Sequence, residues 1–355
     1  MRILSRDRGT VIAALVAVAL LLSSVFAAEP APLNPAVANS VAIGTNDTRI
    51  SDMGPDQNTP YSLFQVHAAY NSVNNEFLVV WAGEDNTAPL VDGEIEIFGQ
   101  RIDATTGSEL GTNDFRISDM GDDSETDPSV RTSFFALDPQ VSYNATNNEY
   151  LVVWMGNDDT APTVSGENEI YGQRLAGATG AEVGANDFRI SDMGGDGANG
   201  FNAQSAAVAY NSIANEYLVV WAGADSVSPL VGGEPEIFGQ RINAETGAET
   251  GSNDFRITDL GNDAETDASV RDNFDAFNPK VAYSSTENEY LVVWQGDDDS
   301  TNASDNSLVD GEREIFGQRL NGATGAEAGI NDFRISDLGA DGTTGFSASE
   351  PDVAY

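Results

Sequence analysis

The sequence predicts an all-β protein, specifically a β-propeller-like array of four-stranded antiparallel blades. Three observations support this fold class. A unit of 67–78 residues recurs along the chain, and such repeats indicate an array of identical supersecondary units. Each unit offers four short segments rich in Val, Ile, Tyr, Phe and Trp, which are typical of strands. After the N-terminal segment, no stretch has the apolar periodicity of a helix.

Four sequence elements define each unit. The first two are a Tyr and, 11 residues later, a Trp that ends an apolar run: Tyr70/Trp81, Tyr143/Trp154, Tyr210/Trp221 and Tyr283/Trp294. The third is Ile-(Phe/Tyr)-Gly-Gln-Arg, which ends at Arg101, Arg174, Arg241 and Arg319. The fourth is Arg-Ile-(Ser/Thr)-Asp, which begins at Arg49, Arg116, Arg189, Arg256 and Arg334. In the second unit we expect strands around residues 141–143, 150–154, 170–175 and 188–191.

The spacing of these elements predicts how the loops are distributed. The first-to-second and third-to-fourth steps are constant, whereas the other two connections vary in length. In an antiparallel meander the constant turns lie at one end and the variable loops at the other, and radial stacking of such sheets gives a propeller. A solenoid is the alternative, although its coils are usually shorter. The lone strand at residues 48–51 and the end of the chain within a first strand predict four complete blades in a truncated chain. The alternation of loop lengths predicts an even ring of six or eight blades.

The N-terminus is typical of an export signal. Three arginines precede an apolar run of 12 residues, and Val25-Phe26-Ala27 has the small-x-small pattern of a cleavage site. We therefore expect a signal peptide over 1–27, a linker over 28–45 and propeller repeats over 46–355. The run is shorter than the roughly 20 residues of a membrane span, so no span is expected after cleavage. The expected location is secreted or at a bacterial cell surface.

Composition excludes several functions. Removal of residues 1–27 takes away three of the 16 basic residues and one of the 57 acidic ones, leaving a net charge of about −43. Such a charge excludes nucleic acid as a partner. There is no cysteine, so disulfides and thiolate chemistry are excluded. The single histidine, His67, aligns with Gln140, Ala207, Lys280 and Asp352 in the other units, and this lack of a shared residue predicts no catalytic or metal role.

The repeat resembles repeats of bacterial exported and cell-surface proteins that are described as adhesin-like. The resemblance rests on Asn-Glu-Tyr-Leu-Val-Val-Trp (148–154), Glu-Ile-Phe-Gly-Gln-Arg (236–241) and Asn-Asp-Phe-Arg-Ile-Ser-Asp (186–192). It covers nearly all of the mature chain. It implies an exported protein and no particular chemistry.

The regularly repeated side chains are expected to be structural. The tryptophans recur at one strand position, which indicates packing between blades. The arginines are expected to pair with the repeated acids Glu96, Glu169, Glu236 and Glu314, or with backbone carbonyls between blades.

Acidic loops suggest a cation site. The turn (Ser/Thr)-Asp-(Met/Leu)-Gly-x-Asp occurs in all five copies, and Asp in such turns commonly caps the backbone. Two long loops extend it with acids at alternate positions, and Ca²⁺ takes six to eight oxygens from such groups. The candidate ligands are Asp119, Asp123, Glu125, Asp127, Asp259, Asp263, Glu265 and Asp267. Ca²⁺ is the one cofactor expected, and solvated acidic loops are the alternative.

These observations lead to one expected function and one alternative. The expected function is a secreted or cell-surface binding or scaffold module, adhesive and stabilised by calcium, with an extracellular protein or glycan as partner. The alternative is an extracellular polysaccharide-acting hydrolase with a propeller fold, because paired carboxylates serve glycoside hydrolysis. With 57 acidic residues, chance pairs are inevitable, and no unique acid is flanked by unique aromatic residues. The sequence therefore favours a protein that is not an enzyme.

Overall fold

A computed structural model describes most of the chain after the N-terminal segment. The described residues are 48–53, 61–85, 88–91, 93–123, 125, 127–158, 166–195, 200–225, 235–260, 275–297, 312–339 and 345–355. They belong to one compact unit, Asp47–Tyr355. Among them, no helix is long and apolar enough to cross a membrane.

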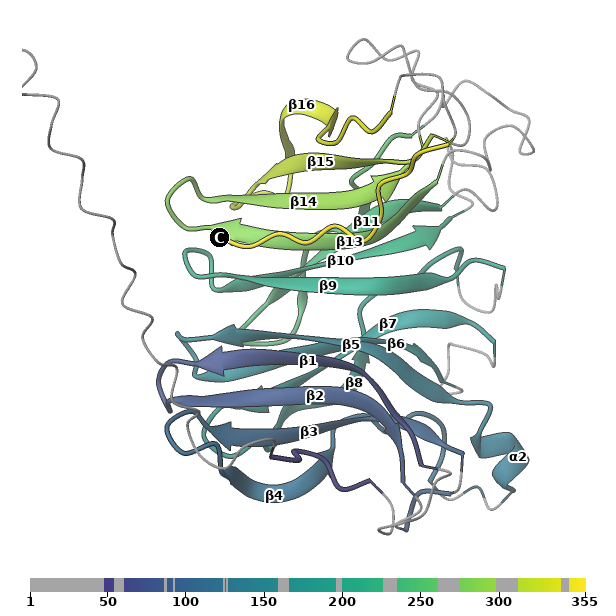
Figure 1. The fold of residues 1–355 in the computed structure, drawn as a ribbon, viewed down its shortest axis with the longest axis vertical. Coiled ribbons are helices and arrows are strands. Elements are labelled where there is room, and N and C mark those ends of the chain that lie inside the picture. The colour runs from purple at the N-terminus through teal and green to yellow at the C-terminus, as the bar shows by residue number, and fades with distance from the viewer. Residues whose placement is uncertain are drawn as a thin grey trace, which may run out of the picture. The chain divides into compact units, whose positions relative to one another are not determined.

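Within these described residues, sixteen strands form four consecutive blades (Figure 1). Blade 1 consists of β1 (Leu63–Asn71), β2 (Glu76–Glu84), β3 (Ile95–Asp103) and β4 (Glu109–Arg116). Blade 2 consists of β5 (Phe135–Asn144), β6 (Glu149–Asn157), β7 (Asn168–Ala176) and β8 (Glu182–Arg189). Blade 3 consists of β9 (Ala203–Asn211), β10 (Glu216–Ala224), β11 (Pro235–Asn243) and β12 (Glu249–Arg256). Blade 4 consists of β13 (Ala276–Ser284), β14 (Glu289–Gly296), β15 (Glu314–Asn321) and β16 (Glu327–Arg334).

The strands of each blade pair antiparallel in chain order, which confirms the predicted fold class. Blades 1 and 2 are joined into one sheet only by a single parallel pair, Ile95 with Phe135. A helix of one turn, α2 (Pro128–Arg131), precedes blade 2. The fourth strand differs from the expectation: β8 ends at Arg189, so most of it precedes the Arg-Ile-Ser-Asp element. Ser191 follows the strand, and its hydroxyl accepts the N–H of Ile170 at 2.7 Å.

Asparagine side chains shape the tight turns. In blade 1, Asn71 Oδ1 accepts the N–H groups of Val73 and Asn74 at 2.9 and 2.8 Å. Asn75 then takes a φ of 55°, which asparagine tolerates better than most residues. The N–H of Ala104 donates to the carbonyl of Asn75 at 3.0 Å. This bond places the two constant turns of the blade side by side, as the spacing predicted.

The hydrophobic core lies between successive blades. Trp154 and Tyr150 of blade 2 are fully buried and pack with Ile117 and Met120 of blade 1. The same arrangement joins blade 2 to blade 3 and blade 3 to blade 4. The four tryptophans are at most 1% exposed, so the expectation of packing between blades is confirmed.

For the arginines of the third strands the pairing differs from the prediction, whereas Arg256 forms an ion pair with the predicted partner Glu236 at 3.5 Å. Arg101 donates two hydrogen bonds to Glu76, at 2.8 and 2.7 Å, and the equivalent pairs are Arg174–Glu149, Arg241–Glu216 and Arg319–Glu289. Their partners are therefore the acids that begin the second strand. The Glu before the third strand instead accepts from the repeated hydroxyl, as Glu169 does from Ser191. The other predicted partner, a backbone carbonyl of a neighbouring blade, is also seen: Arg174 of blade 2 donates to the carbonyl oxygen of Glu245 in blade 3 at 3.1 Å.

The first strands of the blades form the inner wall. β1 packs beside β5, β5 beside β9, and β9 beside β13. The segment 345–355 runs along β13 in Figure 1, and the Glu350 N–H donates to Gln295 Oε1 of blade 4 at 3.0 Å. Asp352 is an electrostatic neighbour of His67 in β1. This closeness favours five positions about one axis over the even number expected from loop lengths.

Candidate active site

Every inner segment carries a backbone irregularity at the same position. The pairing of β1 with β2 shifts register between Phe64 and His67, and the other three blades show the equivalent shift. One residue of each inner segment takes a left-handed backbone, with φ of 52–57°: Gln65, Asp138, Ser205, Asn278 and Glu350. Bulges of this kind re-aim side chains and are frequent beside active sites. Non-glycine residues are held in this conformation only by surrounding structure.

The side chains at the bulge and two residues later differ from blade to blade. We call them the axial cluster: Gln65, His67, Asp138, Gln140, Ser205, Asn278, Lys280, Glu350 and Asp352. The flanking residues repeat, since a Tyr follows in all five copies and the residue directly before it is Ala or Ser. Variation between constant neighbours is what a functional centre built on a repeated scaffold requires.

Hydrogen bonds connect the cluster across blades. The N–H of Asp138 donates to Gln65 Oε1 at 2.9 Å. Gln140 Nε2 lies 2.9 Å from His67 Nε2, and because an amide NH₂ can only donate, this geometry requires an unprotonated His67 Nε2. Ser205 Oγ donates to Asn278 Oδ1 at 3.3 Å. The bulges of blades 1 and 2, and of blades 3 and 4, therefore hold one another.

The charges of the cluster influence one another. Burial raises the pKa of Asp138, and the nearby cations Lys280 and His67 oppose that shift in part. Burial also lowers the pKa of His67, with a further lowering by Lys280, while Asp138 and Asp352 act in the opposite direction. A carboxyl group whose pKa is raised stays protonated at higher pH and can act as a general acid. Asp138 has this character, with two further carboxylates, Glu350 and Asp352, on the fifth inner segment.

The sequence predicts no catalytic or metal role for His67, because the equivalent positions share no residue. The structure places His67 beside Gln140 and within electrostatic range of Lys280 and Asp352. A signal for this arrangement lies in the aligned units, where polar residues vary between constant neighbours.

The predicted calcium ligands are only partly within the described residues. Asp123 accepts hydrogen bonds from Arg116 at 2.9 Å and from Arg131 at 2.6 Å. Asp119 and Asp259 form ion pairs with the arginines three residues before them, at 3.1 and 3.3 Å. Glu125 and Asp127 lie beside α2, where the Glu125 carboxylate accepts the Asp127 N–H. Asp263, Glu265 and Asp267 lie outside the described residues.

Within the part of the chain that the structure describes, no group of three or more His, Asp or Glu side chains is placed to hold a metal ion. The calcium site therefore stays a prediction, and a melting experiment tests it. If the acidic loops bind Ca²⁺, millimolar calcium should raise the melting temperature over that in EDTA at equal ionic strength. Replacing Asp263, Glu265 and Asp267 by amides should remove that response. An identical melting temperature in calcium and EDTA would eliminate the site.

The repeated buried acids are a structural set. Burial raises the pKa of Glu169 to about 8, although Ser191 and Met193 donate hydrogen bonds to it. Burial also raises the pKa of Asp187 and Asp254 to about 7. Asp187 accepts the N–H of Asp119 in the preceding blade at 2.7 Å. These carboxyl groups hold the turns between blades, and their recurrence argues against a catalytic role.

These shifts predict how stability depends on pH. A carboxyl group whose pKa is higher in the folded state contributes stability below its unfolded pKa and loses it as pH rises through the folded value. We therefore expect the melting temperature to fall between about pH 4 and 8, from the ordinary carboxyl pKa up to the raised values of Asp187, Asp254 and Glu169. Glu169→Gln, which mimics the protonated acid, should flatten this fall, whereas the exposed Glu109→Gln should not. Parallel curves for wild type and Glu169→Gln would contradict the assignment.

Comparisons with known proteins give a likeness of fold. No family model matches the chain, and no curated protein matches it. One similar solved structure is a thermostable family-43 glycoside hydrolase, with 14% identity over 79% of this chain and 78% of that chain and a TM-score of 0.42. A second is an N-acetylgalactosamine deacetylase from F. plautii in complex with blood group B trisaccharide, with 12% identity over 79% of this chain and 71% of that chain and a TM-score of 0.40. A third is an endo-1,5-alpha-L-arabinanase from Thermotoga petrophila RKU-1, with 13% identity over 78% of this chain and 62% of that chain and a TM-score of 0.41.

These matches correct the functional expectation. The similar structures are glycoside hydrolases and a deacetylase rather than adhesins, so the expected non-catalytic binding or scaffold module gains no support from them. Only the propeller part of the resemblance stated above is confirmed. At 12–14% identity and TM-scores near 0.4 the likeness concerns the fold, so no substrate and no residue role is transferred from it.

Proposed function

We propose that this chain is an exported hydrolase of polysaccharide and that the axial cluster is its active site. The observation that carries the proposal is the set of unrepeated polar side chains on the bulged inner segments, among which His67, Asp138 and Lys280 influence one another. The described blades repeat their core packing and their Arg–Glu pairs. This wall differs from blade to blade, and it contains carboxyl groups from different segments.

The groups available match glycoside hydrolysis. That reaction uses one carboxylic acid to protonate the leaving oxygen and a second carboxylate as base or nucleophile. Asp138, whose pKa is raised by burial, is the proposed acid. Glu350, which occupies the equivalent bulge position of the fifth inner segment, is the proposed second carboxylate. Lys280 and His67 lie close enough to Asp138 to influence its charge and would orient it.

The charge of the chain narrows the substrate class. A net charge of −41 repels polyanions, so neutral glycans are favoured over uronate-containing ones. The test is the release of reducing ends from a panel of neutral and acidic polysaccharides, followed by NMR of the first product anomer. We expect release from a neutral member. A folded chain that releases nothing from any member of the panel would overturn the proposal.

A further inference from the structure

A pocket lies between the outer strands of blades 3 and 4. It has a volume of about 310 Å³, at the lower end of the range for small-molecule sites. Blade 3 contributes residues of β11 and β12, and blade 4 contributes the end of β15, the turn after it and the start of β16. The axial cluster instead lies on the inner segments, which begin the blades (Figure 1). The pocket is therefore separate from the proposed active site.

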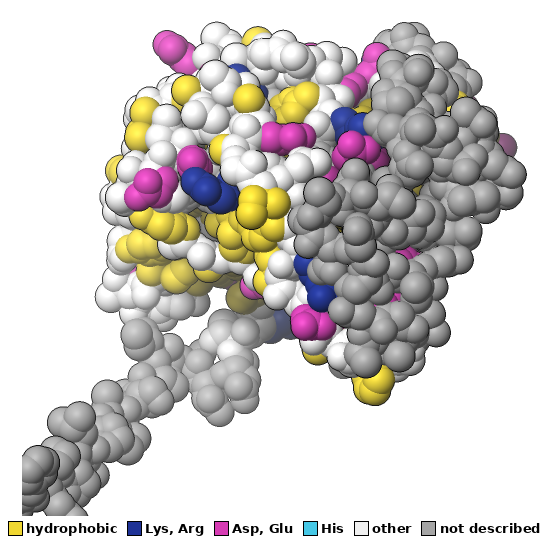
Figure 2. All heavy atoms as spheres, turned by 90° about the horizontal axis from the view of Figure 1, so that it is seen from above, with side chains coloured by type: hydrophobic (Ala, Val, Ile, Leu, Met, Phe, Trp, Pro, Cys, Tyr) yellow, Lys and Arg dark blue, Asp and Glu magenta, His cyan; other side chains and the backbone are white. Residues whose placement is uncertain are grey.

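The lining of the pocket carries both signs of charge. Arg241 and Arg256 come from blade 3, and Glu327 comes from blade 4. Arg256 forms an ion pair with Asp259 at 3.3 Å. Partial burial raises the pKa of Glu327, Asp259 raises it further, and Arg256 opposes the rise. Figure 2 shows acidic side chains beside basic ones also at the blade 4 end of the molecule. An anion in the pocket would meet Glu327 and a chain of net charge −41, and a cation would meet two arginines, so an uncharged ligand is favoured.

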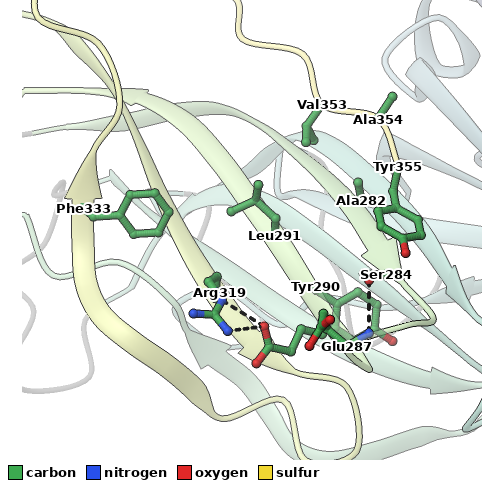
Figure 3. Close-up of a pocket in the computed structure, with 11 residues that line it drawn as sticks. Ala282, Ser284, Glu287, Tyr290, Leu291, Arg319, Phe333, Val353, Ala354 and Tyr355 are labelled. Carbon is green, nitrogen blue, oxygen red and sulfur yellow. Dashed lines mark hydrogen bonds and ion pairs between the residues drawn. The ribbon is translucent and has the colours of Figure 1, made fainter.

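A glycine turn closes one side of the pocket. Gly325, at φ 75°, packs on Arg241 and Phe255, because a Cβ added to it would lie 3.1 Å from Arg241 Cδ and 3.4 Å from Phe255 Cζ. Arg241 is itself fixed by two hydrogen bonds that it donates to Glu216, at 2.9 and 2.7 Å. Figure 3 shows the equivalent Arg319 of blade 4 held by a glutamate through the same two donors. The wall of the pocket is thus preorganised.

Two hydroxyl groups distinguish this pocket from the equivalent positions of the other blades. Thr250 lies directly opposite Arg241 in the pairing of β12 with β11, and Ser252, two residues later, also lines the pocket. Blade 3 is the one unit with a hydroxyl group at both positions. The other blades hold Leu110 and Thr112, Val183 and Ala185, and Ala328 and Ile330.

We propose that this pocket binds a neutral segment of a glycan chain, apart from the axial cluster. Sugar hydroxyl groups both donate and accept hydrogen bonds, which suits a lining of guanidinium donors, a carboxylate acceptor and hydroxyl groups that do both. The C–H face of a sugar ring can pack on the ring of Phe255, which supplies apolar contact area. The proposal concerns binding alone and does not depend on the hydrolase function.

Threonine methyl signals test the proposal. Asp138→Asn, which should leave oligosaccharides intact, is labelled with ¹³C at threonine methyl groups and with ¹⁵N at histidine. It is titrated with hexaoses of glucose, xylose, galactose and arabinose, and with a hexaose of galacturonic acid. We expect the signal of Thr324, a lining residue, to move saturably with at least one neutral hexaose. The galacturonic acid hexaose should bind more weakly, because its carboxylates would meet Glu327. The signals of His67 report the axial cluster in the same sample.

Two substitutions that copy blade 2 remove the hydroxyl groups. Thr250→Val with Ser252→Ala gives β12 the side chains that β8 has at these positions, so the fold should be kept. This double variant should weaken the binding read from Thr324 about tenfold, through the loss of two hydrogen bonds. Leu110→Val with Thr112→Ala makes the corresponding change in blade 1 and is the matched control, with unchanged affinity.

Three outcomes would overturn the glycan site. The first is a folded protein whose Thr324 signal no neutral hexaose moves, including the case in which only the His67 signals shift. The second is an affinity that Thr250→Val with Ser252→Ala leaves unchanged. The third is tighter binding of the galacturonic acid hexaose than of every neutral one.

Discussion

Asp138→Asn should lower kcat/KM for polysaccharide hydrolysis by about 10²–10⁴-fold, the range for the loss of a general acid. The amide keeps the shape of the carboxyl group but cannot deliver its proton. The fold should survive, because asparagine tolerates the left-handed backbone that Asp138 adopts at φ 57°. Asn278 already occupies the equivalent bulge of β13 at φ 52°. Rates and melting curves of wild type and variant measured together separate chemistry from stability.

The dependence of the hydrolysis rate on pH tests the same prediction in a second way. Because burial raises the pKa of Asp138, the wild-type rate should fall as pH rises through that value, and the variant should lose this alkaline limb. Glu109→Gln, an exposed change on β4, is the matched control and should leave both rate and profile unchanged. An Asp138→Asn variant with the wild-type rate and profile would exclude Asp138 as the acid.

Arg101→Met should reduce the free energy of unfolding by about 3–5 kcal/mol, the typical result of removing one partner of a buried ion pair. Arg101 and Glu76 are 9% and 2% exposed, and two hydrogen bonds join them. Without the guanidinium, the Glu76 carboxylate would remain buried and unpaired. The double variant Arg101→Met with Glu76→Leu should recover a large part of the loss, because no buried charge is then left. Urea unfolding measures the free energy of unfolding of the single and the double variant.

The chain contains its own control for this prediction. Arg319 pairs with Glu289 at 2.5 Å in the same arrangement, but its side chain is 50% exposed. Arg319→Met should therefore cost only about 0–1 kcal/mol, as exposed pairs do. Equal losses for Arg101→Met and Arg319→Met would show that burial does not determine the contribution of these pairs.

The sequence predicted the structural features that recur in every unit. Four copies of the Tyr, Trp and arginine elements identified the blades, their strand order and the packing of the tryptophans. The fourth strand was misplaced because Ser191 and its equivalents look like strand residues, whereas their hydroxyls bond the neighbouring strand from outside it. The partners of the third-strand arginines were misassigned because Glu76 and Glu96 are both repeated acids. Only the register of β2 with β3, which sets Leu78 opposite Arg101, places Glu76 within reach.

The axial cluster could not be predicted, for a different physical reason. A repeat marks the positions that recur, whereas His67 and its equivalents vary from unit to unit. In a radial array, equivalent positions of the inner strands converge on one axis, so five different residues can form one asymmetric site. The bulges that aim Asp138 and its equivalents there depend on backbone geometry that composition and spacing do not reveal.

His67 provides the most direct test of the axial site, because it is the only histidine in the chain. In an untagged, ¹⁵N-labelled protein its imidazole gives one set of NMR signals from the centre of the cluster. We expect a pKa for His67 below the ordinary value of histidine and a saturable shift of these signals when oligosaccharide is added to Asp138→Asn, which should bind it without turnover. Imidazole signals that stay unchanged at saturating concentrations of an oligosaccharide that the wild type hydrolyses would contradict it.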